Sequence, residues 1–262
     1  MPAPISVQLY SLREQMKDGK HAEIIQRLAA TGYKGVECAG YYGLQPKELR
    51  KLVADNGMVV SSNHAPLPNE QTLQQCIDNH KDLGTTFAVC PWLPREEYAT
   101  VDAIKKVADK FNAVLDPLAK AGITLLMHNH DWEFSRVEGT LAVEHLLAHC
   151  PKLQLEIDTY WACNFGAEVP AKMVSQFKGR TPLLHLKDGS FEHKKPMVAC
   201  GAGKQDFAAI VAAADPTVLK WVVVELDECA TDMWTAIADS YTHLVGKGFA
   251  VGNKPANTAA KK

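Results

Sequence analysis

Polar and ionisable residues close most of the short apolar runs in this 262-residue chain. Several of them are imidazoles or carboxylates. The residues are Gln8, Glu37, His64, His128, His130, Asp158, His185, Lys187 and Glu225. If gathered at one place and left unpaired, they would cost too much desolvation, whereas a divalent cation would neutralise the carboxylates and use the imidazoles as ligands. The residue types therefore predict a metal site, and its nitrogen and oxygen donors suit Mn²⁺, Co²⁺, Zn²⁺ or Mg²⁺.

An alternation of strands and helices must bring these residues together. Short runs rich in Val, Ile and Leu alternate with longer segments of helical periodicity, about every 30 residues. The expected strands are 5–9, 35–38, 59–63, 86–90, 124–129, 153–158, 183–186 and 221–225. The expected helices are 21–30, 46–55, 70–82, 101–120, 140–149, 171–177, 207–214 and 233–245. Eight strands alternating with eight helices indicate an α/β fold, a (β/α)8 TIM barrel.

A doubly wound open sheet is the alternative fold. It normally has a glycine-rich turn after the first strand, but residues 10–14 here are Tyr-Ser-Leu-Arg-Glu. In a barrel the active site lies at the C-terminal ends of the strands. Because side chains alternate along a strand, His128 and His130 share one face, as do His185 and Lys187. We expect one barrel domain at 1–250 and a polar tail at 251–262.

Composition and charge favour a small-molecule partner. The formal net charge is -2 without a basic block, so neither nucleic acid nor a membrane surface is expected as a partner. The seven cysteines are scattered singly, which predicts reduced, mostly buried thiols. The first residues lack a signal-peptide pattern and no long apolar run is present, so we expect a cytoplasmic protein. The sequence does not exclude a homo-oligomer.

Six segments give the chain a family resemblance. They are SNHAPL at 62–67, HNHDWEF at 128–134, LEIDTYW at 155–161, PLLHLKDG at 182–189, GAGKQDF at 201–207 and VVVELDE at 222–228. On these segments the chain resembles the xylose isomerase-like TIM barrel superfamily. This group includes sugar phosphate isomerase/epimerases, ketose 3-epimerases, inosose dehydratases and AP endonuclease 2-type barrels such as endonuclease IV.

The resemblance implies a metal-ligand set. Such proteins typically hold one metal with Glu, Asp, His and Glu at the ends of strands five to eight. Asp158, His185 and Glu225 match three of these positions, and His128 stands where the first glutamate is expected. The fourth ligand is His128, His130 in its place, or water. We predict one divalent ion, Mn²⁺ by preference, bound by His128, Asp158, His185 and Glu225.

The resemblance also implies a reaction. The common step is abstraction of a proton α to the carbonyl of a sugar or keto-sugar through a metal-stabilised enediolate, which predicts an isomerase or epimerase. In the epimerases two glutamates form the acid/base pair, and a histidine follows the strand-six aspartate. This chain has His128 in place of the first glutamate and Trp161 in place of that histidine. We therefore expect His130 to act opposite Glu225, with Lys187 as a second candidate acid. The residues expected to bind substrate are Gln8, Glu37, His64, Trp92 and Trp161.

Three other functions stay open from the sequence. A dehydratase or lyase acting on keto-sugars or inososes would use the same first step and then eliminate a β-substituent. A non-catalytic barrel subunit would have the fold without the chemistry. A nuclease resembling endonuclease IV would need further histidine ligands, but strand four ends in Cys90-Pro91-Trp92 without one. The acidic charge balance also disfavours binding to a phosphate backbone.

Overall fold

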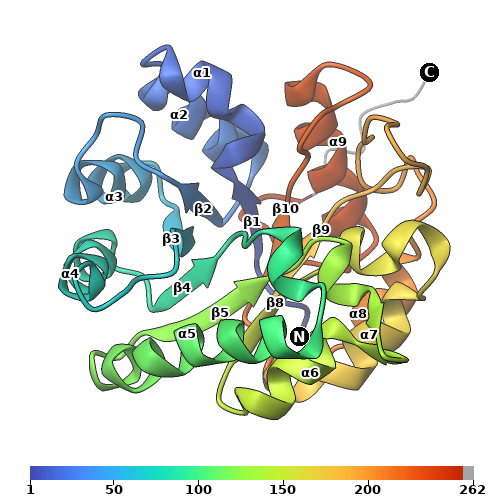
Figure 1. Ribbon diagram of the computed structural model, residues 1–262. Helices are drawn as coiled ribbons and strands as arrows, with labels where there is room; N and C mark the ends of the chain where they lie inside the picture. Colours follow the sequence, from blue (N-terminus) through green and yellow to red (C-terminus); the bar gives the residue numbers. More distant parts are fainter. Residues whose placement is uncertain (256–262) are drawn as a thin grey trace.

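The computed structural model describes residues 1–255, in which eight parallel strands close into a barrel surrounded by helices (Figure 1). The barrel strands are β1 (Ile5–Gln8), β2 (Gly35–Ala39), β3 (Val59–His64), β4 (Phe87–Cys90), β5 (Thr124–His128), β8 (Gln154–Asp158), β9 (Leu183–Leu186) and β10 (Trp221–Val224). The predicted TIM barrel is confirmed. Each strand differs from its predicted range by no more than one residue at an end.

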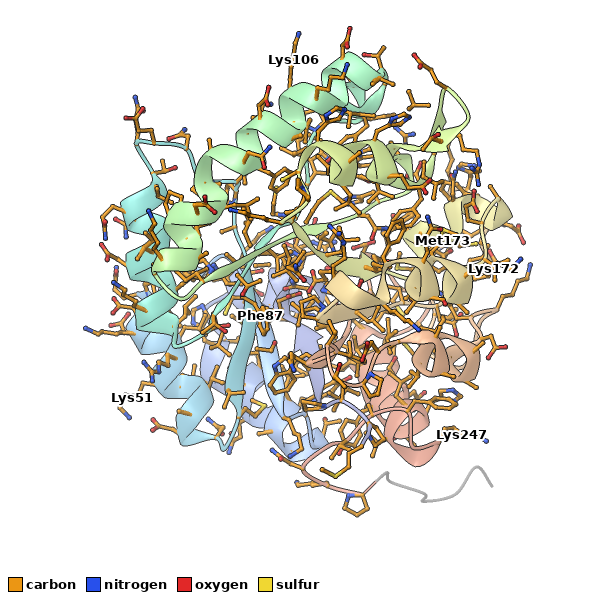
Figure 2. The ribbon with its side chains drawn as sticks, turned by 90° about the horizontal axis from the view of Figure 1, so that it is seen from below. Lys51, Phe87, Lys106, Lys172, Met173 and Lys247 are labelled. Atoms are coloured by element: carbon orange, nitrogen blue, oxygen red, sulfur yellow. The ribbon has the colours of Figure 1, made fainter. Side chains whose placement is uncertain are left out.

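The helices cover the outside of the barrel. They are α1 (Arg13–Lys17), α2 (His21–Thr31), α3 (Pro46–Asp55), α4 (Leu73–Leu83), α5 (Val101–Lys120), α6 (Ala142–His149), α7 (Pro170–Phe177), α8 (Phe207–Ala213) and α9 (Met233–Gly246). Asp206 and Asp232 cap α8 and α9 through hydrogen bonds from the backbone amides of Ala209 and Thr235. Figure 2 shows lysines of these outer elements, such as Lys51 and Lys106, extending away from the ribbon.

Two predicted helix starts were wrong, each for a local reason. Helix α4 begins at Leu73 rather than residue 70, because the Asn69 side chain accepts hydrogen bonds from the backbone amides of Gln71 and Thr72 and forms a turn. Helix α6 begins at Ala142 rather than residue 140. The two preceding residues form β7 (Thr140–Leu141), which pairs with β6 (Arg136–Val137) in a hairpin.

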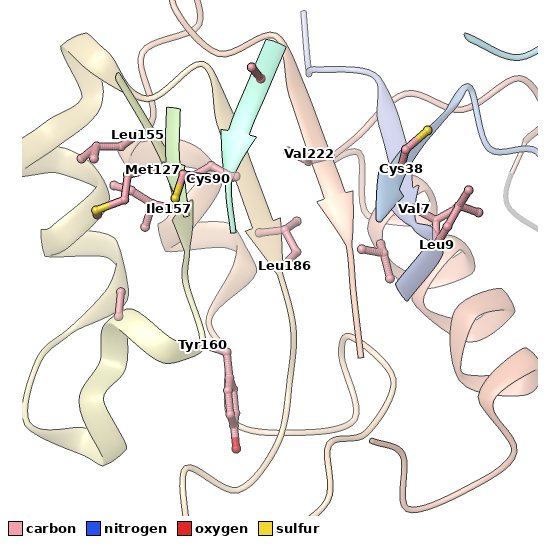
Figure 3. Packing of buried hydrophobic residues seen from close by; sticks show 14 of the residues in the cluster. Val7, Leu9, Cys38, Cys90, Met127, Leu155, Ile157, Tyr160, Leu186 and Val222 are labelled. Carbon is pink, nitrogen blue, oxygen red and sulfur yellow. The ribbon is translucent and has the colours of Figure 1, made fainter. Parts of the chain in front are cut away.

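Apolar packing on both faces of the barrel wall positions the strands. Outward-facing residues such as Val7, Met127 and Leu186 pack under the helices (Figure 3). A separate buried cluster consists of Val89, Leu126 and Leu183, with Phe87 and Trp221 packed against it. Leu126 and Leu183 precede His128 and His185 by two residues, so this cluster lies in the barrel interior below the histidines.

The remaining predictions about the chain concern its cysteines, its end and membranes. All seven cysteines are free, and five of them are buried, as predicted. Val251 pairs with Pro4 beside the barrel, whereas residues 256–262 of the predicted tail lie outside the described residues. None of the described helices combines the length and the apolar composition that a membrane crossing needs.

Candidate functional site

The four predicted metal ligands lie together at the C-terminal ends of adjacent strands. His128, Asp158, His185 and Glu225 are buried, and their ligand atoms all lie within 4.8 Å of one another. Asp158 and His185 are direct neighbours in the register of β8 and β9. Nδ1 of His185 is 3.0 Å from Oε2 of Glu225, and Nε2 of His128 is 3.8 Å from Oδ2 of Asp158. We call these four residues the upper cluster.

The donor set of the upper cluster fits a divalent ion. Two imidazoles and two carboxylates form the mixed nitrogen and oxygen environment that suits Mn²⁺, Co²⁺ or Zn²⁺. Oδ2 of Asp158 is buried and accepts no hydrogen bond of good geometry, although Lys187 Nζ lies 3.0 Å away. Burial raises the pKa of Asp158 to about 6 despite the opposing effects of Lys187 and His185. Such a carboxylate is ready to coordinate a cation.

Lys187 supplies a positive charge inside the site. Its side chain is only 1% exposed, and Nζ lies 2.7 Å from Oε2 of Glu225 and 3.0 Å from both carboxylate oxygens of Asp227. Burial by itself lowers the pKa of Lys187, but Asp158, Asp227 and Glu225 together hold it well above the usual value. The ammonium group therefore stays charged.

A second group of ionisable side chains lies beside the upper cluster. Oε2 of Glu156 is 2.6 Å from Nε2 of His64 and 3.2 Å from both Nδ1 of His128 and Nε2 of His185. Burial by itself raises the pKa of Glu156, yet His185 and His64 hold it well below its usual value. Glu37 also contacts His185, with 2.5 Å between Oε2 and Nε2.

His130 occupies an aromatic environment above the upper cluster. Its ring stacks on Trp132 with the centroids 4.5 Å apart and the planes at 4°, and Trp161 lies 6.2 Å away. Burial, with a further contribution from Lys187, lowers the pKa of His130 to about 3. Its backbone amide donates to Oε2 of Glu133, 2.8 Å away. The imidazole is therefore neutral near pH 7 and held in a fixed orientation.

A cavity of about 470 Å³ opens over these groups. It is lined by Tyr10, Ala39, His64, Ala65, Pro66, Pro91, Trp92, His128, His130, Lys187, Glu225 and Asp227. Trp92 and Tyr10 are well exposed, at 54% and 42%. Their aromatic rings add apolar surface to a lining that also contains ionisable groups. The volume lies within the range usual for sites that bind small molecules.

The predicted substrate-binding residues lie in different places. His64 and Trp92 line the cavity, whereas Gln8 and Glu37 are fully buried outside the cavity lining. The side-chain amide of Gln8 donates to Oε2 of Glu37, with 2.8 Å between the atoms. Trp161 is outside the lining set too, and its indole donates to Oδ2 of Asp227 at 3.2 Å.

Sequence reasoning missed two acidic residues of this region, Glu156 and Asp227. Glu156 precedes Asp158 by two residues, so the alternation of strand side chains places both in the barrel interior. A charged residue within the apolar run LEID was the available signal. Asp227 follows β10 in a loop, and nothing in its local sequence announces its contact with Lys187.

Comparison with known proteins gives matches over the whole barrel. The profile of the family described as "Xylose isomerase-like TIM barrel" matches residues 25–239. A sugar phosphate isomerase/epimerase structure from Parabacteroides distasonis ATCC 8503 is similar, with 26% identity and a TM-score of 0.81 over 96% of both chains. An L-ribulose 3-epimerase structure shares the fold, with 17% identity and a TM-score of 0.68 over 94% of each chain. No curated protein sequence matches the chain.

Proposed function

Because the chain belongs to the xylose isomerase-like TIM barrel family, we propose that it is a metal-dependent isomerase or epimerase that removes the proton α to the carbonyl of a sugar or keto-sugar. The observation that carries the proposal is the upper cluster, in which four buried ligand atoms lie within 4.8 Å of one another. The cavity beside it contains a neutral imidazole, an ammonium group and two carboxylates. These groups can move a proton and balance the charge that results.

His128, Asp158, His185 and Glu225 would hold the ion, with Mn²⁺ as the preferred choice. A divalent ion bound there supplies a Lewis acid that polarises a substrate carbonyl and lowers the cost of negative charge on its oxygen. Burial holds the pKa of His128 well below its usual value, so its imidazole is neutral and has a lone pair to offer. Burial by itself lowers the pKa of His185, but Glu156 and Glu37 hold it well above the usual value, so His185 would have to give up a proton to become a ligand. The two positive charges of the ion would then balance the two carboxylates of the upper cluster.

His130 is the residue we propose as the base. Its ring lines the cavity, and stacking on Trp132 restricts its rotation. Burial lowers the pKa of His130, so the imidazole is unprotonated before the reaction, and negative charge that develops on the substrate would raise this pKa towards the working pH as the proton leaves carbon. Glu225 lines the same cavity and is the partner that we propose to return or exchange a proton.

Lys187 is the residue we propose to stabilise charge on the substrate. Its Nζ is held by Glu225 and Asp227 at 2.7 and 3.0 Å and lines the cavity. An ammonium fixed in this way can donate a hydrogen bond to an oxygen that becomes negative as the proton leaves carbon. The Trp92 face can pack on the C–H face of a sugar ring while the ionisable groups contact its oxygens.

The test distinguishes the role of His130 as the base from the role of His128 as a metal ligand. We expect His130→Asn to keep its Mn²⁺ content and to lower deuterium uptake from solvent into a keto-sugar by roughly 10² to 10⁴-fold, the usual contribution of a general base. His128→Asn should instead lower Mn²⁺ content. His149, exposed at the end of α6, gives the control variant His149→Asn, which should change neither quantity.

Two outcomes would count against this assignment. If His130→Asn exchanges deuterium as fast as the unmodified chain, another residue is the base, and Lys187 becomes the better candidate. If the product has lost a β-substituent while deuterium uptake at carbon still requires His130, the enzyme is a lyase with the same first step.

A further inference from the structure

A closed ring of alternating nitrogen and oxygen atoms lies next to the upper cluster. His64 Nε2 is 2.6 Å from Glu156 Oε2, and Glu156 Oε2 is 3.2 Å from His185 Nε2. His185 Nε2 is in turn 2.5 Å from Glu37 Oε2, which is 3.2 Å from His64 Nε2. The two imidazole rings are almost parallel, with 7° between their planes and 5.2 Å between their centroids. We call Glu37, His64, Glu156 and His185 the lower cluster.

The residues of the lower cluster converge from four strands of the barrel. Glu37 comes from β2, His64 from β3, Glu156 from β8 and His185 from β9. Glu156 precedes Asp158 on the same face of β8, so its Cα lies about 6 to 7 Å further into the barrel. Three of the four residues are absent from the upper cluster. His185 alone belongs to both clusters. Its Nδ1 faces Glu225 of the upper cluster, and its Nε2 faces Glu37 of the lower cluster.

The charge of the lower cluster distinguishes it from the upper one. Lys187 lies within 3.0 Å of Asp158 and Glu225, but in residues 1–255 no lysine or arginine nitrogen lies within 4.0 Å of Glu37 or Glu156. Both carboxylates are fully buried and surrounded by imidazoles. A divalent cation in the ring would balance the charge of both carboxylates and bind the imidazole nitrogens in place of their protons.

One oxygen in this cluster is left without a partner. Oε1 of Glu156 is buried and accepts no hydrogen bond from the described residues, which is costly in a barrel interior. A metal ion bound by both oxygens of Glu156 would satisfy it. Both oxygens of Glu37, by contrast, accept hydrogen bonds. Ser62 Oγ donates to Oε1 at 2.5 Å, and Gln8 Nε2 donates to Oε2 at 2.8 Å. Such outer hydrogen bonds orient a carboxylate ligand.

The spacing of the ring atoms suits a metal centre. Bonds of about 2.1 Å at tetrahedral or octahedral angles place neighbouring ligand atoms about 3.0 to 3.4 Å apart. The four contacts of the ring run from 2.5 to 3.2 Å, so a small expansion would admit the ion. Two imidazole nitrogens and two carboxylates are donors for Mn²⁺, Co²⁺ or Zn²⁺.

We propose that Glu37, His64, Glu156 and His185 bind a second divalent cation in the barrel interior. His185 would then bridge the two metal positions through its two ring nitrogens, with both ring protons released to solvent when the two ions bind. This site does not depend on the reaction proposed above, because its ligands are defined by their own contacts. It also explains why Gln8 and Glu37, which were expected to bind substrate, lie outside the cavity lining: they build the lower site instead.

The experiment counts Mn²⁺ ions. The full chain is stripped with a chelator, loaded with Mn²⁺, desalted and analysed for bound metal, with electron paramagnetic resonance to detect coupling between neighbouring Mn²⁺ ions. We expect two equivalents in the unmodified chain and one in His64→Asn, in Glu156→Gln and in Asp158→Asn. The exposed control His149→Asn should keep two. His64 lies at the edge of the cavity, so His64→Asn provides a folded variant even if Glu156→Gln fails to fold.

The outcomes separate this site from the proposed catalytic one. A single equivalent that Asp158→Asn removes and His64→Asn retains would overturn the second site and leave the proposed function standing. A single equivalent that His64→Asn removes and Asp158→Asn retains would support the lower site and overturn the ligand set of the upper one. No bound Mn²⁺ in the unmodified chain would overturn both.

Discussion

The loop that follows β9 should depend on a single buried carboxylate, that of Asp188. Its Oδ1 accepts hydrogen bonds from the backbone amides of Gly189 and Gln205, at 2.8 and 3.0 Å. Its Oδ2 accepts from the amides of Gly201 and Gly203, at 2.8 and 3.0 Å. Four amides spread over 17 residues of chain are thus tied to the residue after Lys187. We predict that Asp188→Asn is strongly destabilising.

The magnitude follows from the hydrogen-bond geometry. Asparagine keeps one acceptor oxygen and replaces the other with an NH₂ group, so two of the four amides would face a donor. Each hydrogen bond to a charged group contributes about 1.5 to 3 kcal/mol, so losing two predicts a loss of about 3 to 6 kcal/mol. For a chain of this size that lowers the melting temperature by roughly 6 to 20 °C.

Urea and thermal unfolding at pH 7, in the presence of a chelator, would measure the effect. Asp215→Asn is the matched control. Asp215 is only partly buried, and the amide and hydroxyl of Thr217 both donate to its Oδ1, which asparagine can reproduce. The control should unfold like the unmodified chain. A loss below about 1 kcal/mol for Asp188→Asn would refute the reasoning, because it would mean that water or a shifted loop replaces the two bonds.

Two further predictions concern buried charges near the cavity. Lys187→Met leaves Asp158 and Glu225 without their ammonium and should cost about 3 to 5 kcal/mol at pH 7. Mn²⁺ should restore much of that loss, and equal melting-temperature losses with Mn²⁺ and with chelator would contradict this. Burial raises the pKa of Glu133 from 4.5 to about 8, so the folded chain binds an extra proton between these pH values and loses stability as the pH rises. Glu133→Gln lacks this titration and should gain stability relative to the unmodified chain by about 1 kcal/mol or more per pH unit in that window. Urea unfolding from pH 5 to 8.5 would measure this gain, and parallel pH profiles would argue against it.

The alternation of side chains explains how much of the site could be predicted from sequence. Strand ends such as His128, Asp158 and His185 stand out because a polar residue terminates an apolar run, and the barrel then places such ends at one mouth. Glu156 was overlooked because it lies inside its run, where burial of a charge is unexpected. The contact of Asp227 with Lys187 depends on the path of a loop, which local sequence does not determine.

The boundary between apolar and ionisable layers explains why the barrel tolerates so many buried charges. On three strands an inward-facing apolar residue is followed, two positions later, by an inward-facing ionisable residue. These pairs are Leu126 and His128, Leu183 and His185, and Val223 and Glu225. Below this boundary, the aliphatic side chains of these three strands fill part of the interior and supply stability, as do those packed under the helices. Above it, ion pairs that are fully buried contribute little net stability, because desolvation offsets their attraction. Folding alone therefore gives no reason to keep the ionisable layer, whereas the proposed binding of cations and a polar substrate does.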